Sequence, residues 1–344
     1  WLLLTPVSFL FLVWGVTRRS FISIFLIIIL SAGMSYVYGS PAYLFSLWLI
    51  WFGYLGFMLL KHWPDKPLRH FLLLYTVLLL LLWVGSHAWW LTNFIRSSGY
   101  VFAQFNAEDL RQRGSDVVVA LKQQTDPAYI LRGLSRFQLY DTQEWGKFYS
   151  WPPIVLLSWL PALVVFASSL SYKLRHRTQW LFFFGLTILV LFISKGANPP
   201  FGWLNLLIYD RFSWLAPLRN PYEKVGIILA LSYALLFAMQ LETWRSRALR
   251  GIIIVSCLGI LVWPMWSGKI FSGGASRSVI SVPEYYAQAS AWLKPRLGDR
   301  RILHLPLAPG ESVDYDWGYS GVEPSQLLFP GSSFSYAVGL SAID

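Results

Sequence analysis

Charged residues are scarce in this chain of 344 residues, and their scarcity excludes most soluble folds. They make up 13% of the sequence, whereas hydrophobic residues make up 56%. A soluble globular domain carries roughly 25% charged residues. Cysteine is rarer still, because Cys257 is the single one. It forms no intrachain disulfide and no multi-cysteine metal site, and it gives no information on the redox compartment.

Several catalytic motifs are also missing. The sequence contains no HExxH, no Walker A motif and no GxSxG. These motifs are typical of metalloproteases, nucleotide hydrolases and serine hydrolases, so none of these three classes is predicted. We predict neither a metal nor a cofactor.

Long apolar runs dominate what is present. A membrane-crossing helix needs about 20 mostly apolar residues. The runs near that length are 1–16, 21–38, 42–60, 71–95, 153–171, 179–194, 224–241 and 251–266. We therefore predict an α-helical polytopic membrane protein with about eight transmembrane helices. Because residue 1 is Trp inside an apolar run, we expect the chain to be a fragment of a longer protein.

The connections between these runs alternate in charge. Every second connection is basic and short, and together these hold eleven Lys and Arg residues with Asp65 and Glu242 as the only acids. They are 17–20, 61–70, 173–177 and 242–250. Positive loops stay cytoplasmic, so we predict that these four face inward. The net charge of +11 then reflects topology, and no nucleic acid is predicted as a partner.

Three longer segments are predicted to lie on the opposite side of the membrane. They are the outer loops 96–152 and 195–223 and the tail from 267 onward. Within the tail, "FSGGASRS" is typical of a linker, "VPEYYAQASAWLKPRL" predicts a helix and "RRILHLPL" predicts a strand. We therefore divide the chain into a transmembrane domain (1–271) and the beginning of an extracytoplasmic α+β domain (272–344).

The outer loop 96–152 contains a pattern typical of an amphipathic helix, "TDPAYILRGLSRFQLY" (125–140). Asp126 suits the N-cap and Pro127 the first helical position. Ile130, Leu134 and Phe137 fall on one face, as in a helix lying at the membrane interface. A helix packed on its own loop would give the same pattern.

The segment "LRNPYEK" precedes the run 224–241 and is the main candidate site. Asn220 is a favoured N-cap, Pro221 suits the first helical position, and Glu223 stands where a capping-box acid belongs. A helix N-terminus also attracts anions. With Arg219, Tyr222 and Lys224 beside it, the segment is a candidate contact for a lipid-linked phosphate. A plain helix start with two interface anchors would explain the same residues.

Five further residues are candidate substrate contacts, each with a structural alternative. His87 and Trp89 end a run on the outer side, where aromatic rings could stack on a sugar or simply form an aromatic belt. Asn198 lies in the turn sequence "SKGANPPFGW". Asp316 with Trp317, in "DYDWGYSGVEP", combines a carboxylate and a ring as carbohydrate sites do, and as Gly-rich turns also do.

Two stretches carry a resemblance to a known family. "KGANPPFGWLNLLIYDRFSWLAPLRNPYEK" resembles a segment of bacterial membrane glycosyltransferases of the GT-C superfamily. The tail "VPEYYAQASAWL…RRILHLPLAPGESVDYDWGYSGVEPSQLLF" is similar to the α-(1→3)-arabinofuranosyltransferase family. The resemblance spans roughly residues 70–344.

This resemblance implies a multi-pass enzyme of the bacterial cytoplasmic membrane. It implies a polyprenyl-phosphate sugar as donor, a cell-envelope glycan or lipid as acceptor, and catalysis on the extracytoplasmic face. It also implies a catalytic carboxylate in a first outer loop, which we expect upstream of Trp1. A flippase or transporter of lipid-linked saccharides and a non-catalytic assembly scaffold remain alternatives. Transporters line their spans with polar residues, whereas here the polar residues gather in the outer loops, which favours the enzyme.

Overall fold

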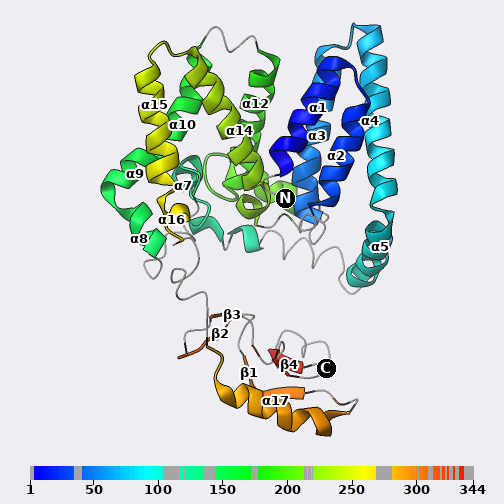
Figure 1. Cartoon of the computed structure of the whole chain (residues 1–344), viewed down its shortest axis with the longest axis vertical. Coiled ribbons are helices and arrows are strands. Elements are labelled where there is room, and N and C mark those ends of the chain that lie inside the picture. The colour runs from blue at the N-terminus through cyan, green and yellow to red at the C-terminus, as the bar shows by residue number, and fades with distance from the viewer. Residues whose placement is uncertain are drawn as a thin grey trace. The chain divides into compact units, whose positions relative to one another are not determined.

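The computed structural model divides into two compact units (Figure 1). One contains 1–142 and 146–262, and the other contains 143–145 and 263–344. The structure describes residues 4–34, 41–103, 116–119, 121–134, 144–171, 177–212, 215, 218, 220–268, 281–298, 300, 302–308, 313–317, 320–321, 324, 328–329 and 333–336.

The first unit is helical throughout its described residues. Its longer helices are α1 (Leu4–Arg18), α2 (Ile22–Ala32), α3 (Pro41–Lys61), α4 (Lys66–Ser86), α5 (Ala88–Ala103), α12 (Thr178–Ser194), α13 (Gly202–Arg211) and α14 (Pro221–Thr243). Shorter ones are η2 (Leu121–Gln123), α7 (Pro127–Leu131), α8 (Glu144–Ser150), α9 (Pro152–Ser158), α10 (Leu160–Ala167), η4 (Ser168–Leu170), α15 (Arg247–Val255) and the π-helix η6 (Ser256–Leu261). Each of the eight predicted spans coincides with one or more of these helices.

Four helical runs are long and apolar enough to cross a membrane, as judged by length and composition among the described residues. They are Ala42–Lys61, Lys66–Ser86, Pro152–Leu170 and Pro221–Thr243. Helices α1, α2 and α12 are apolar but shorter. The fold is thus a helical membrane architecture, and the count of eight spans stays a prediction.

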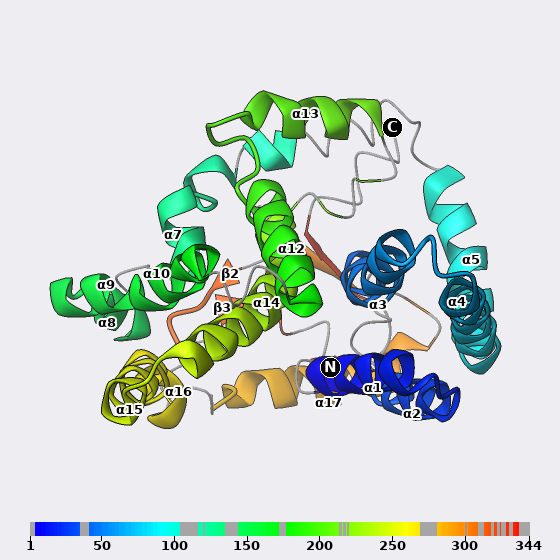
Figure 2. The same cartoon turned by 90° about the horizontal axis from the view of Figure 1, so that it is seen from above.

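Seen end-on, α12 and α14 lie between two groups of helices, α1–α4 on one side and α9, α10 and α15 on the other (Figure 2). The large buried core includes Trp51 of α3, Tyr75 of α4 and Phe183 of α12, all almost fully enclosed. One polar pair in this core joins α2 to α4, because the Ser23 and Tyr75 hydroxyls lie 2.7 Å apart. A Cβ on Gly15 would lie 1.9 Å from the Ser23 oxygen, so only glycine allows α1 and α2 to approach this closely.

Two contacts bring predicted cytoplasmic loops together at one end of this unit. Lys61 at the end of α3 donates to Thr178 at the start of α12. Arg177 forms a 2.7 Å ion pair with Glu242 near the end of α14. The helix ends next to these basic connections therefore lie at the same end of the unit (Figure 1), as the predicted alternation of loops requires. Which side of a membrane this end faces stays a prediction.

Two sequence predictions about helices are wrong. The run 71–95 is not one helix, because α4 ends at Ser86 and α5 starts at Ala88. The predicted amphipathic helix is not continuous over 125–140, because α7 ends at Leu131, although Asp126 does cap it by accepting from the Ala128 amide. The chain turns out of the helix at Gly133, whose φ is +73°. Phe137 lies outside the described residues.

In its described residues, the second unit combines α16 (Trp263–Trp266) and α17 (Glu284–Leu297) with four short strands. Strand β1 (Ile302–Ala308) pairs in parallel with β4 (Ser333–Tyr336), and β2 (Val313–Asp314) pairs antiparallel with β3 (Ser320–Gly321). Helix α17 and β1 lie where the sequence predicts a helix and a strand. The predicted boundary at 271/272 falls among residues outside the description and stays a prediction.

Candidate functional site

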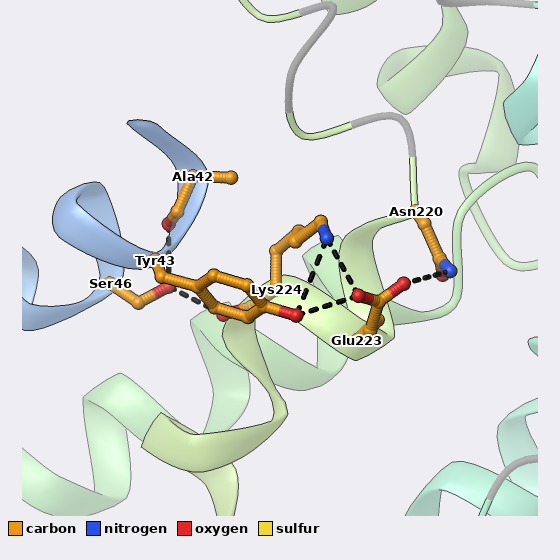
Figure 3. A network of polar contacts seen from close by, with 6 residues as sticks. All are labelled: Ala42, Tyr43, Ser46, Asn220, Glu223 and Lys224. Carbon is orange, nitrogen blue, oxygen red and sulfur yellow. Dashed lines mark hydrogen bonds and ion pairs between the residues drawn. The ribbon is translucent and has the colours of Figure 1, made fainter. Parts of the chain in front are cut away.

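The candidate site lies where α14 begins and α3 begins beside it (Figure 3). As predicted, Asn220 occupies the N-cap position and Pro221 starts α14. Proline has a fixed φ suited to this position and lacks the N–H that a first helical residue could not pair. Three polar side chains, Asn220, Glu223 and Lys224, are thereby presented on the first turn.

The Glu223 carboxylate is the centre of a hydrogen-bond network. Its Oε1 accepts from the Tyr43 hydroxyl at 2.6 Å and from the Lys224 ammonium at 2.6 Å. Its Oε2 accepts from the Asn220 amide at 2.7 Å. Because three donors already hold this carboxylate, it serves to position them.

The capping role predicted for Asn220 is wrong. Its side chain caps no backbone amide of α14, because its amide nitrogen instead points to Glu223. Charge-assisted hydrogen bonds are about twice as strong as neutral ones, which accounts for this choice of partner. The first turn of α14 is fixed from outside as well, since the Ser46 hydroxyl donates to the Lys224 carbonyl at 2.6 Å.

Lys224 is held on two sides. Its side chain is 18% exposed and ion-pairs with Glu223, and its ammonium lies 4.5 Å from the centre of the Tyr43 ring. A longer contact of 3.4 Å joins the same ammonium to the Tyr43 hydroxyl. An ammonium has three N–H donors. One of them therefore remains for an anion, since no other side chain in the described part of the chain accepts it.

Two other residues of this segment were predicted as substrate contacts. Arg219 lies outside the described residues. Tyr222 is partly buried and packs against the main helical core.

Asn198 is buried in a network of its own. Its amide nitrogen lies within hydrogen-bond distance of the carbonyls of Lys122, Thr125 and Lys195, at 2.7, 2.9 and 3.1 Å. In return, the Lys195 ammonium donates to the Asn198 carbonyl at 2.8 Å. This network ties the end of α12 to the chain before α7, and it gives Asn198 a structural role.

Lys195 itself is a cation that the sequence analysis did not select. It follows α12 directly, is 7% exposed, and lies over the Phe192 ring at 4.8 Å. Burial lowers the pKa of its ammonium. The sequence does contain a signal for this residue, because Lys195 is the charged residue that directly follows the apolar run 179–194. Tyr43, the other missed residue, carried no comparable signal.

His87 and Trp89 lie at the break between α4 and α5. His87 is buried, stacks on Trp83 at 4.7 Å, and its Nδ1 lies 2.9 Å from the Trp83 carbonyl oxygen. Trp89 is 71% exposed, as an interface ring would be. The histidine is thus held by its own helix end.

Asp316 and Trp317 belong to the second unit. Asp316 is exposed, and the Trp317 ring packs 6.0 Å from Tyr286 of α17 and 5.4 Å from Tyr315. They form part of an aromatic cluster. No group of three or more His, Cys, Asp or Glu suited to a metal occurs among the described residues of either unit.

One comparison with known proteins gives a match. A family model described as alpha-(1->3)-arabinofuranosyltransferase, N-terminal GT-C domain, matches residues 120–336. The match includes α12, α14 and the second unit through β4, while Tyr43 lies before it. No curated protein and no solved structure matches the chain.

Proposed function

The chain belongs to the family of N-terminal GT-C domains of α-(1→3)-arabinofuranosyltransferases, and from this premise we propose that it moves a sugar from a polyprenyl-phosphate donor to a cell-envelope glycan or lipid acceptor. Membership makes it a membrane glycosyltransferase of the GT-C class. The donor, the acceptor and the extracytoplasmic location are our proposal. Because the family description names arabinofuranosyl transfer, polyprenyl-phosphate arabinofuranose is the first donor to test.

The observation that carries the proposal is the Tyr43–Glu223–Lys224 network at the start of α14. The leaving group of such a transfer is the lipid-linked phosphate, which lies at the membrane surface. It therefore needs a cation where a span begins. Lys224 stands at such a position, on a helix N-terminus that itself favours anions. Glu223 and the Tyr43 ring fix the ammonium before the donor arrives, which is the preorganisation that stabilises developing charge.

The location of this network supports the outer face. It lies at the start of α14, whereas the ion pair between Arg177 and Glu242 joins basic loops at the end of α14. If positive loops face the cytoplasm, the Lys224 end faces outward. The Asn198 and Lys195 network follows α12, which packs against α14. Arg219 remains part of the proposed phosphate contact by sequence alone.

The test is transfer of labelled sugar from a polyprenyl-phosphate donor by purified membranes containing the full-length protein. Lys224→Gln should lower the rate by roughly tenfold to a hundredfold, the loss expected for a charge-assisted contact made in the transition state. Lys224→Arg should restore part of it. Lys66→Gln, at the exposed start of α4, is the matched control and should leave the rate unchanged.

Either of two results would contradict the proposal. One is transfer that requires a nucleotide sugar and ignores the polyprenyl-phosphate donor. The other is movement of an intact lipid-linked saccharide across the bilayer with no new glycosidic bond, which would identify a transporter.

A further inference from the structure

A largely apolar pocket of about 560 Å³ lies near the end of α14, against α10, α15 and η6. Its walls include Pro161, Tyr233, Phe237, Ala238, Cys257 and Leu258. Two charged residues, Glu242 and Arg250, also line it. The pocket therefore combines a long apolar wall with a charged end.

Arg250 is the unusual member of this lining. Its Nε atom is buried and has no hydrogen-bond partner among the residues that the structure describes. A buried donor without an acceptor is costly, so such an atom calls for a partner. Glu242 lines the same pocket but does not accept from this Nε. Its Oε2 atom pairs with Arg177 at 2.7 Å.

We propose that this pocket binds an anionic glycerophospholipid, with one acyl chain along α14 and the phosphate accepting a hydrogen bond from Arg250. From Leu241 to Tyr233, α14 rises about 12 Å. That length accommodates much of an acyl chain. A phosphate oxygen on the Arg250 guanidinium, which has five N–H donors, would form a charge-assisted hydrogen bond of the stronger kind.

The chemistry of the walls selects against other ligands. A sugar or a nucleotide would bury hydroxyl and ring nitrogen groups against carbon, without partners. Leu258 is 59% exposed and Ile254 40% exposed, which makes this side of the unit a surface for acyl chains.

The charge around the pocket favours an anionic lipid of one leaflet. Arg247 begins the same helix as Arg250, Arg245 lies two residues before that helix, and Arg177 directly precedes α12. Basic side chains at a membrane surface attract anionic lipids, which are enriched on the cytoplasmic side. This site lies at the other end of α14 from Lys224 and does not depend on the proposed donor.

Cys257 provides the measurement, because it lines the pocket and is the single cysteine of the chain. The full chain is placed in nanodiscs of phosphatidylcholine, with or without phosphatidylglycerol, and the rate of alkylation by N-ethylmaleimide is followed. Phosphatidylglycerol should slow alkylation about tenfold, the loss of access expected from one charge-assisted contact. Arg250→Gln should abolish that protection. Arg247→Gln, exposed one turn earlier on α15, should keep it.

A second measurement counts lipids retained after mild delipidation, by native mass spectrometry. The wild type should keep one phosphatidylglycerol, and both Arg250→Gln and the pocket-filling variant Ala238→Trp should lose it. Ala238 is exposed, so the larger side chain needs no repacking of the core. Equal protection by phosphatidylcholine alone would overturn the proposal. Protection by a polyprenyl phosphate at concentrations where phosphatidylglycerol gives none would overturn it too, and would assign the pocket to an isoprenoid lipid.

Discussion

The Tyr43 hydroxyl on α3 donates a 2.6 Å hydrogen bond to the carboxylate of Glu223 on α14, and the two residues are 180 positions apart in the sequence. This contact joins the starts of two membrane-length helices. It also places an aromatic ring under the Lys224 ammonium. The cation is thus positioned by a helix that lies outside the family match.

The first prediction tests this contact. Tyr43→Phe keeps the ring beneath Lys224 and removes only the hydroxyl that fixes Glu223. Sugar transfer should fall roughly threefold to tenfold, as expected for one hydrogen bond. Thermal stability should change little, and Tyr285→Phe, at an exposed tyrosine of α17, serves as the control. An unchanged transfer rate would show that the hydroxyl does not position Lys224.

Variants of Asn220 can separate two roles of its side chain, which are capping the start of α14 and donating to Glu223. Aspartate is as good an N-cap as asparagine, so Asn220→Asp should be harmless if the residue caps α14. The structure predicts the opposite, because a second carboxylate would face Glu223 where an amide now donates. We expect a lower transfer rate for Asn220→Asp than for Asn220→Ala, measured at matched protein amounts. The reverse order would restore the capping interpretation.

Asn198 is predicted to act on stability. Asn198→Ala leaves carbonyls of Lys122 and Thr125 without their donor, and should lower the free energy of unfolding by about 1–3 kcal/mol. The measurement is the thermal midpoint in detergent beside the transfer rate per folded molecule. Asn93→Ala, at an exposed position on α5, is the control. A variant with the wild-type midpoint and a lower rate would instead support the substrate contact inferred from the sequence.

Membrane topology can be tested with reporter fusions. Fusions after residues 65, 175 and 246 should report the cytoplasm, because these sites lie in the basic connections. Fusions after 120, 205 and 300 should report the opposite side. Two sites with exchanged locations would break the eight-span arrangement, and with it the assignment of Lys224 to the outer surface.

Local signals predicted the helix starts well. Asp126 and Asn220 were identified as N-cap positions from their own side chains and the prolines that follow, and both helices begin there. Hydropathy likewise located the helical runs. Helix ends were harder, because the turn at Gly133 depends on a positive φ that composition alone does not reveal. The break at His87 was missed because the apolar residues on both sides of Ser86 and His87 were read as one run.

The sequence alone could not predict which side chains contact each other between different helices. Nothing near Tyr43 distinguishes it from the other aromatic residues of α3, so its contact with Glu223 follows only from how α3 packs on α14. The Asn220 side chain was assigned to its local backbone amide, although a charged acceptor three residues away competes for it. Charge competition of this kind depends on side-chain geometry, which spacing does not determine.

The last prediction concerns Lys195 and pH. Burial lowers the pKa of its ammonium below the ordinary value of 10.5, so the folded protein releases this proton at a lower pH than the unfolded chain does. In the window just below 10.5 the unfolded chain therefore binds more protons, and stability rises with pH. Below that window both states are charged, and the cost of burying the charge is constant.

Lys195→Met removes this titration while keeping a long side chain in contact with Phe192. The thermal midpoint of the wild type minus that of Lys195→Met should therefore increase as the pH rises from neutral toward 10.5. Lys294→Met, at an exposed lysine of α17, should show a difference that does not change with pH. A flat difference for Lys195→Met would mean that the buried ammonium is already compensated. The described residues supply this ammonium with a carbonyl and a ring but no carboxylate, so a bound anion is the first source of compensating charge to test.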